Sequence, residues 1–173
     1  MFVAVLAAGC GSTRSVVVTV TVASLPTAAA PPADQTIYGR PSSIQLAGGR
    51  TILHFDPAFM TSGITANAAA AVAQGLKCKP TSCPPVPNDY FVADAAHEDL
   101  VFVLPASSSG TVLARRGASG NAFPPTRIDG AQLATIVSEG KAPGITLFEP
   151  LDSGLWLRLH GDTIRSFAQQ YRP

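Results

Sequence analysis

The chain has 173 residues, of which 46% are hydrophobic and 13% are charged, enough for one ordinary domain and a tail but not for two full domains. Its 12 Lys and Arg nearly balance its 11 Asp and Glu, so no overall field draws it onto nucleic acid or an anionic membrane, and we expect no nucleic-acid partner. The 15 glycines and 15 prolines predict many turns around a modest core.

The N-terminus has the pattern of an export signal. Residues 2–9 are a short apolar run with small residues before Cys10, and the run is far too short to span a bilayer. The segment Leu6-Ala7-Ala8-Gly9-Cys10 looks like a bacterial lipobox. The resemblance implies cleavage before Cys10, diacylation of its thiol, and an extracytoplasmic protein anchored to the cell membrane by lipid. Only Met1, and no Lys or Arg, precedes the run, and an ordinary apolar terminus with a free thiol is the alternative.

Residues 1–9 are therefore expected to be a signal-peptide remnant, residues 10–34 a tether, and residues 35–173 a single globular domain. The tether is rich in Ser, Thr, Ala and Pro, a composition typical of linkers. Its segment Val16–Val22 is β-prone and could instead join the domain's sheet.

The first elements of the domain are a hairpin and a helix. Extended patterns over residues 37–46 and 51–55 flank Gly48-Gly49, which supplies the positive φ angles of a tight turn. Asp56-Pro57 is predicted to end the second strand. Residues 64–74 predict an Ala-rich helix capped by Gly75, which packs on the sheet through Ile64, Ala68 and Ala71 or Val72.

Two cysteines follow this helix. Cys78 and Cys83 are the ends of a six-residue segment that contains Pro80, and such a turn brings two Cα atoms within disulfide range. An exported chain meets an oxidising compartment. We predict a structural disulfide, because a zinc site would need further ligands at suitable spacing and none is evident.

The middle of the domain predicts further strands and a second helix. Residues 90–94 and 100–104 suit a hairpin with a five-residue loop, and residues 110–115 another strand. Asp129 with Gln132 forms a capping box that starts a helix ending near Gly140. Residues 144–149 are predicted to be a strand.

The chain closes on a hairpin over residues 155–171, with Gly161-Asp162 as a two-residue type II′ turn. This register pairs Arg158 with Arg165 and Trp156 with Phe167. It places a candidate binding surface on the face opposite the core, formed by Trp156, Arg158, Arg165, Phe167 and Tyr171, because Trp, Tyr and Arg dominate binding hot spots. The alternative is that Trp156 and Phe167 are covered and form a second core.

Seven or eight strands with two short helices predict a β-rich α+β domain, mainly an antiparallel β-barrel or a strongly bent sheet. A doubly wound nucleotide-binding fold is not expected, because the helices do not alternate strictly with the strands.

Several segments together resemble a family of uncharacterised exported proteins and lipoproteins of Gram-positive, chiefly actinobacterial, origin. They span most of the domain, and they are Phe55-Asp56-Pro57-Ala58, Ser62-Gly63, residues 86–92, Leu155-Trp156-Leu157 and residues 169–173. In that family an Asn-rich segment often follows the Tyr-Phe-Val strand, whereas residues 93–97 here read Ala-Asp-Ala-Ala-His. The resemblance implies export but no activity.

The candidate reactive groups are few. His54 and Asp56 lie two apart on one predicted strand and would share a face, which could serve a proton relay or a metal, and Asp94 lies near the loop of His97. His97-Glu98-Asp99 could offer ligands to a cation, although a polar loop explains them equally well. We predict no catalytic residues, metal or cofactor, and favour a non-catalytic binding or interaction module. The alternatives are a cell-envelope enzyme using His54, Asp56 and Asp94, and an inhibitor or exclusion factor acting on an envelope partner.

Overall fold

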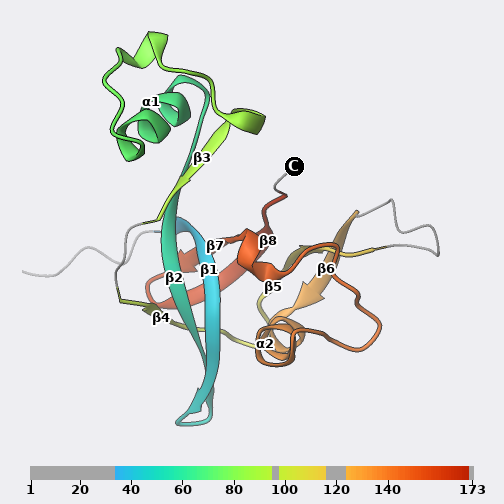
Figure 1. The fold of residues 1–173 in the computed structure, drawn as a ribbon. Helices are drawn as coiled ribbons and strands as arrows, with labels where there is room; N and C mark the ends of the chain where they lie inside the picture. The colour runs from blue at the N-terminus through green and yellow to red at the C-terminus, as the bar shows by residue number, and fades with distance from the viewer. Residues whose placement is uncertain (1–33, 95–97, 116–123, 172–173) are drawn as a thin grey trace, which may run out of the picture. The chain divides into compact units, whose positions relative to one another are not determined.

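The computed structural model describes residues 34–94, 98–115 and 124–171, and these form a β-rich α+β fold (Figure 1). The elements are β1 (Asp34–Ala47), β2 (Arg50–Ser62), α1 (Gly63–Ala73), η1 (Pro80–Ser82), η2 (Pro87–Asp89), β3 (Tyr90–Ala93), β4 (Leu100–Val103), β5 (Ser109–Leu113), β6 (Pro125–Asp129), α2 (Gly130–Glu139), η3 (Leu151–Ser153), β7 (Leu155–His160) and β8 (Thr163–Gln169). None of the helices in these ranges is both long and apolar enough to cross a bilayer.

A closed five-stranded barrel is the centre of the fold. β1 pairs with β2 and β7, β2 also pairs with β4, and β7 pairs with β8, all antiparallel. The parallel contact between Val103 of β4 and Thr163 of β8 closes the ring. β5 continues the sheet from β8, and β6 pairs with β5. The predicted fold class is confirmed.

Both two-residue turns lie where the sequence predicts them. Gly48 and Gly49 have φ of 57° and 73° and connect the paired residues Ala47 and Arg50. Gly161 has φ of 60° and connects the paired residues His160 and Thr163. Residues other than glycine rarely adopt these φ angles, so the glycines allow the chain to form these turns.

The prediction that Asp56-Pro57 ends a strand is wrong, because β2 continues through both residues to Ser62. The far edge of β2 changes partner here: the stretch up to Phe55 pairs with β4 and the stretch from Phe59 pairs with β3. Between these stretches no strand of the described ranges pairs with that edge, so none of them requires the amide hydrogen that Pro57 lacks.

The predicted hairpin between residues 90–94 and 100–104 is also wrong. β3 and β4 do not pair with each other, and instead each pairs with a different part of β2. A long strand can pair with two short strands in succession along one edge, an arrangement that local sequence does not specify.

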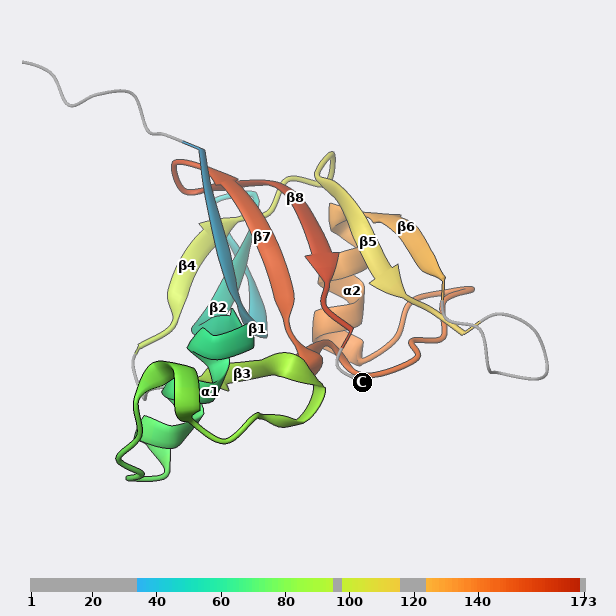
Figure 2. The same cartoon turned by 90° about the horizontal axis from the view of Figure 1, so that it is seen from above.

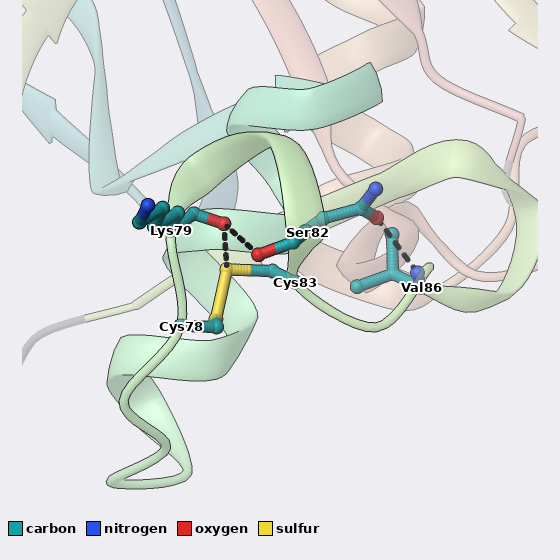
Figure 3. Close-up of a disulfide and its surroundings, with 6 residues drawn as sticks. Cys78, Lys79, Ser82, Cys83 and Val86 are labelled. Carbon is teal, nitrogen blue, oxygen red and sulfur yellow. Dashed lines mark hydrogen bonds between the residues drawn. A yellow bond between two sulfur atoms is a disulfide. The ribbon is translucent and has the colours of Figure 1, made fainter.

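We call residues 59–93 the arm; it contains the end of β2, α1, the two short 3₁₀ turns and β3 (Figure 1). The disulfide between Cys78 and Cys83 is present, with Cα atoms 5.2 Å apart, so that prediction is confirmed. Figure 3 shows the turn that it closes, in which the Ser82 hydroxyl donates to the carbonyl of Lys79 over 3.2 Å. The Val86 amide donates to Oδ1 of Asn67 over 2.8 Å, which ties this turn to α1.

The predicted helix and its cap are confirmed, since α1 ends before Gly75, whose φ is 71°. The predicted packing face of α1 is correct at Ala71 and wrong at Ile64 and Val72. Ala66, Ala70 and Ala71 are the buried residues of α1, whereas Ile64 and Val72 are exposed. The small side chains let α1 approach β3 and β2 closely, and the larger ones face solvent.

The second helix confirms the capping box. The Asp129 carboxylate accepts from the backbone N–H of Gln132 over 2.8 Å, and Oε1 of Gln132 accepts from the backbone N–H of Asp129 over 3.0 Å. α2 ends at Gly140, whose φ of 73° is left-handed. β6, which leads into this helix, was not predicted. The predicted strand over residues 144–149 is wrong: this segment makes only two isolated bridges, Ala114 to Leu147 and Ala142 to Ile145.

The core lies inside the barrel and between its sheet and α2 (Figure 2). Its fully buried members include Leu53 and Phe55 of β2, Leu157 of β7, Ile164 of β8 and Leu133 of α2. Because α2 covers the inner side of β8, β5 and β6, the other side of these strands is the outer surface of the sheet (Figure 2).

Candidate binding site

The strands β1, β7, β8, β5 and β6 expose one continuous surface, which we call the outer sheet face. The pairings Thr36 with Arg158, Arg158 with Ser166, and Ser166 with Ser109 place four polar side chains in one row across it. A parallel row runs through Tyr38, Trp156, Ala168, Thr111 and Arg127. The intervening residues, such as Leu157 and Phe167, point into the core.

A shallow depression of about 250 Å³ lies in this face, and its lining residues are Thr36, Trp156, Arg158, Ser166, Phe167 and Ala168. Ser166 and Ala168 of β8 have small side chains, so the surface over β8 is lower than over the neighbouring Trp156 of β7. The lining offers an indole, a guanidinium and two hydroxyls, but no carboxylate or imidazole. This set can contact a flat apolar surface and donate hydrogen bonds to an acceptor beside it.

Trp156 is held in a fixed orientation. Its indole Nε1 donates to Oε1 of Gln170 over 2.8 Å, and its ring packs on the buried Tyr38 with centroids 4.9 Å apart. Trp156 is half-buried, and the remaining part of its ring lines the depression. A ligand that packs there meets a side chain whose rotamer freedom has already been lost on folding.

A second layer of hydrogen bonds supports Tyr38 and Gln170. The Tyr38 hydroxyl donates to the carbonyl of Ser153 over 2.8 Å. The backbone N–H of Gln170 donates to the carbonyl of Gly154 over 3.0 Å. A side chain at Gly154 would place its Cβ 2.2 Å from the Tyr38 hydroxyl oxygen, so only glycine fits against this ring. Segment 153–154 therefore buttresses Trp156 from behind.

Arg158 provides the cation of the depression. It is exposed and forms no ion pair with any residue that the structure describes. The same holds for Arg165, which is exposed on the neighbouring strand. Uncompensated guanidinium groups favour carboxylate or phosphate ligands, which they can contact through two parallel hydrogen bonds.

The predicted register of the last hairpin is correct only near its turn. A β-bulge lies between the pair Leu159–Ile164 and the pair Arg158–Ser166, so that Trp156 pairs with Ala168. The bulge leaves Arg165 without a directly opposite residue and removes the repulsion that an Arg158–Arg165 pair would cause. Beyond the bulge every residue of β8 faces the opposite way from the prediction.

The shift changes the burial of Phe167. It is 4% exposed and belongs to the core, so its ring is not part of an exposed face as predicted, although the residue adjoins the depression. Tyr171 is 38% exposed and packs against Phe148 with centroids 6.3 Å apart, and it does not line the depression. The structure therefore brings together Trp156 and Arg158 of the five predicted surface residues, with Arg165 exposed in the adjoining bulge.

The predicted catalytic candidates have separate partners. His54 Nε2 lies 3.3 Å from Oε1 of Gln45. Asp56 and Asp94 instead share Arg40, at 3.7 Å and 2.5 Å from its Nη1. The two carboxylates thus lie together around one cation, which pairs with both of them, and His54 is not part of this group.

Asp99 accepts a hydrogen bond from Ser42, while His97 and the proposed lipidation site Cys10 lie outside the described residues. In the described ranges, no group of three or more His, Cys, Asp and Glu is arranged to hold a metal ion. No protein-family model, curated protein or solved structure matches the chain. The resemblance to exported proteins is still a prediction, and function has to be argued from the site.

Sequence reasoning missed Tyr38, Gln170, Thr36 and Ser166 as parts of the site. Tyr38 and Thr36 are on β1, more than a hundred residues before Trp156, and no pattern within β1 shows that it pairs with β7. The consecutive glutamines Gln169 and Gln170 were a usable signal, because amide side chains near a tryptophan in a strand often satisfy its indole N–H.

Proposed function

We propose that the protein is a non-catalytic binding module, anchored outside the cell membrane by lipid on Cys10, that binds ligands at the outer sheet face. The observation that carries the proposal is the fixed indole of Trp156 beside the guanidinium of Arg158, which forms no ion pair within the described residues. The indole is preorganised by its hydrogen bond and its packing on Tyr38, which lowers the entropic cost of binding to it.

The chemistry of the depression favours a ligand that combines a ring or flat apolar surface with an anionic group. The flat surface packs on Trp156, the anion contacts Arg158, and the hydroxyls of Thr36 and Ser166 bind acceptors or donors at the edge. Arg127 lies across the sheet on β6, three strands from Trp156, or about 14 Å at the usual strand spacing. An extended ligand with repeated anionic groups can reach both arginines.

Trp156 is the only tryptophan of the chain, so its fluorescence reports directly on this site. We would titrate the Cys10→Ser protein with two matched pairs of probes: oligogalacturonate with its neutral methyl ester, and phenyl phosphate with phenol. We expect saturable fluorescence changes with the anionic member of a pair and at least tenfold weaker binding of the neutral member.

Arg158→Gln should remove this preference, because it keeps a polar side chain but removes the charge. Arg50→Gln is the matched control, since Arg50 is an exposed arginine at the opposite hairpin turn. The binding proposal is wrong if neither anionic probe alters the fluorescence, or if Arg158→Gln and Arg50→Gln bind alike.

The anchoring half of the proposal is tested separately. Mature protein from an expressing bacterium should partition into the detergent phase and carry an acylated N-terminal Cys10, and Cys10→Ser should remain in the aqueous phase. An exported protein with an intact Met1 terminus would contradict the lipid anchor without affecting the binding site.

A further inference from the structure

The surface of α1 has an unusual distribution of side chains. The helix buries three alanines and exposes its largest aliphatic residues, with Ile64 61% and Val72 77% exposed. Leu76, directly after the helix, is 46% exposed. Ile64 and Val72 are eight residues apart, about two turns of helix, so they lie along one side of α1. Helices of globular domains usually bury such residues.

The segment from α1 to η1 carries charges of one sign. Lys77 and Lys79 are the only charged residues between Asp56 and Asp89, and both are exposed. They follow Leu76 directly, so cationic groups adjoin the exposed aliphatic side chains. The balanced net charge of the chain conceals this local excess of positive charge.

The arm presents these groups from a fixed scaffold. The disulfide closes the turn that carries Lys79 (Figure 3). The hydrogen bonds from the amides of Gly75 and Leu76 to the carbonyls of Val72 and Ala71, of 3.0 Å and 2.8 Å, fix Leu76 against the end of α1. Ile64, Val72, Leu76, Lys77 and Lys79 together are called the arm patch.

We propose that the arm patch docks on the surface of a bilayer that contains anionic lipid. The aliphatic side chains enter the boundary between headgroups and acyl chains, and the two lysines contact anionic headgroups. Charge complementarity supports this occupant, because the patch has two cations and no acid, and the acid nearest to the two lysines along the chain is Asp89 of η2.

The composition of the patch distinguishes a membrane from a protein partner. Protein interfaces are enriched in aromatic residues and Arg and depleted in Lys and Ala. The arm patch instead combines aliphatic residues and lysines on an Ala-rich helix. Docking of this kind would also hold the domain against the membrane surface independently of acylation at Cys10.

The test uses the full chain with Cys10→Ser, so that acylation makes no contribution. Its co-sedimentation is compared between phosphatidylcholine vesicles and vesicles in which about a third of the lipid is phosphatidylglycerol. We expect binding to the anionic vesicles that falls with added salt. Lys77→Gln/Lys79→Gln should weaken it about 25-fold, from about fivefold per lysine, and Ile64→Ser/Val72→Ser should weaken it at least tenfold.

The matched control is Leu46→Ser/Arg50→Gln, which removes an exposed aliphatic residue and an exposed cation from the turn between β1 and β2. It should bind as the parent does. The proposal is overturned if the parent does not bind anionic vesicles, or if the arm variants bind as well as the control. It is also overturned if the parent is a dimer in sedimentation velocity that Ile64→Ser/Val72→Ser dissociates, because a second copy then covers the patch.

Discussion

Gln169 connects three parts of the fold through one buried side chain. Its Oε1 accepts from the Leu113 amide over 2.8 Å. Its Nε2 lies 3.1 Å from the carbonyl of Glu149, 3.3 Å from that of Pro150 and 3.1 Å from Oγ of Ser153. The end of β5 and the segment that buttresses Trp156 are thereby attached to β8. We predict that Gln169→Leu, which changes the side-chain volume little, lowers the free energy of unfolding more than most other substitutions of similar size.

The magnitude follows from the groups left unpaired. The Leu113 amide loses its acceptor in a buried site, which costs about 1–3 kcal/mol, and each hydrogen bond lost by Nε2 contributes about 0.5–1.5 kcal/mol. Burial of the leucine side chain offsets part of this, so we expect a loss of about 3 kcal/mol. For a domain of this size that corresponds to a fall in Tm of about 10 °C.

Urea unfolding followed by circular dichroism measures this loss, with Gln35→Leu as the matched control. Gln35 is exposed and its side chain makes no hydrogen bond to any described residue, so Gln35→Leu should alter stability by less than about 0.5 kcal/mol. If Gln169→Leu is as stable as Gln35→Leu, the network does not hold these segments together and the argument is wrong.

Three further substitutions test other parts of the fold by the same unfolding measurement. Gly110→Ala should prevent stable folding or cost several kcal/mol, because the new Cβ would lie 2.1 Å from the carbonyl oxygen of Phe167; wild-type stability would contradict the β5–β8 pairing. Asp129→Ala should cost about 1 kcal/mol through loss of the capping box, and no loss would indicate that α2 does not need this cap. Cys78→Ser/Cys83→Ser should cost about 2 kcal/mol, as expected for a loop this small, and an unchanged Tm after reduction would contradict the cross-link's role.

Local chemistry determined the features that the sequence predicted correctly. The turns at Gly48-Gly49 and Gly161-Asp162, the capping box of Asp129 and the disulfide of Cys78 each depend on residues only a few positions apart. Their energies are set by backbone angles and short-range bonds, so they are the same wherever the segment lies in the fold. The alternating strands around these turns also predicted a β-rich barrel.

Tertiary structure decided which strands pair and which faces are buried. β2 continues through Pro57 because its edge changes partner there. The bulge between Arg158 and Leu159 turns Phe167 into the core, while Trp156 stays on the outer face. α1 packs through its alanines because close approach to β3 favours small side chains over the larger Ile64. These outcomes depend on contacts between distant residues, in which the burial of one side chain is decided by the register of another strand. The site around Trp156 exists only because β1, β7 and β8 meet, and no single segment contains that information.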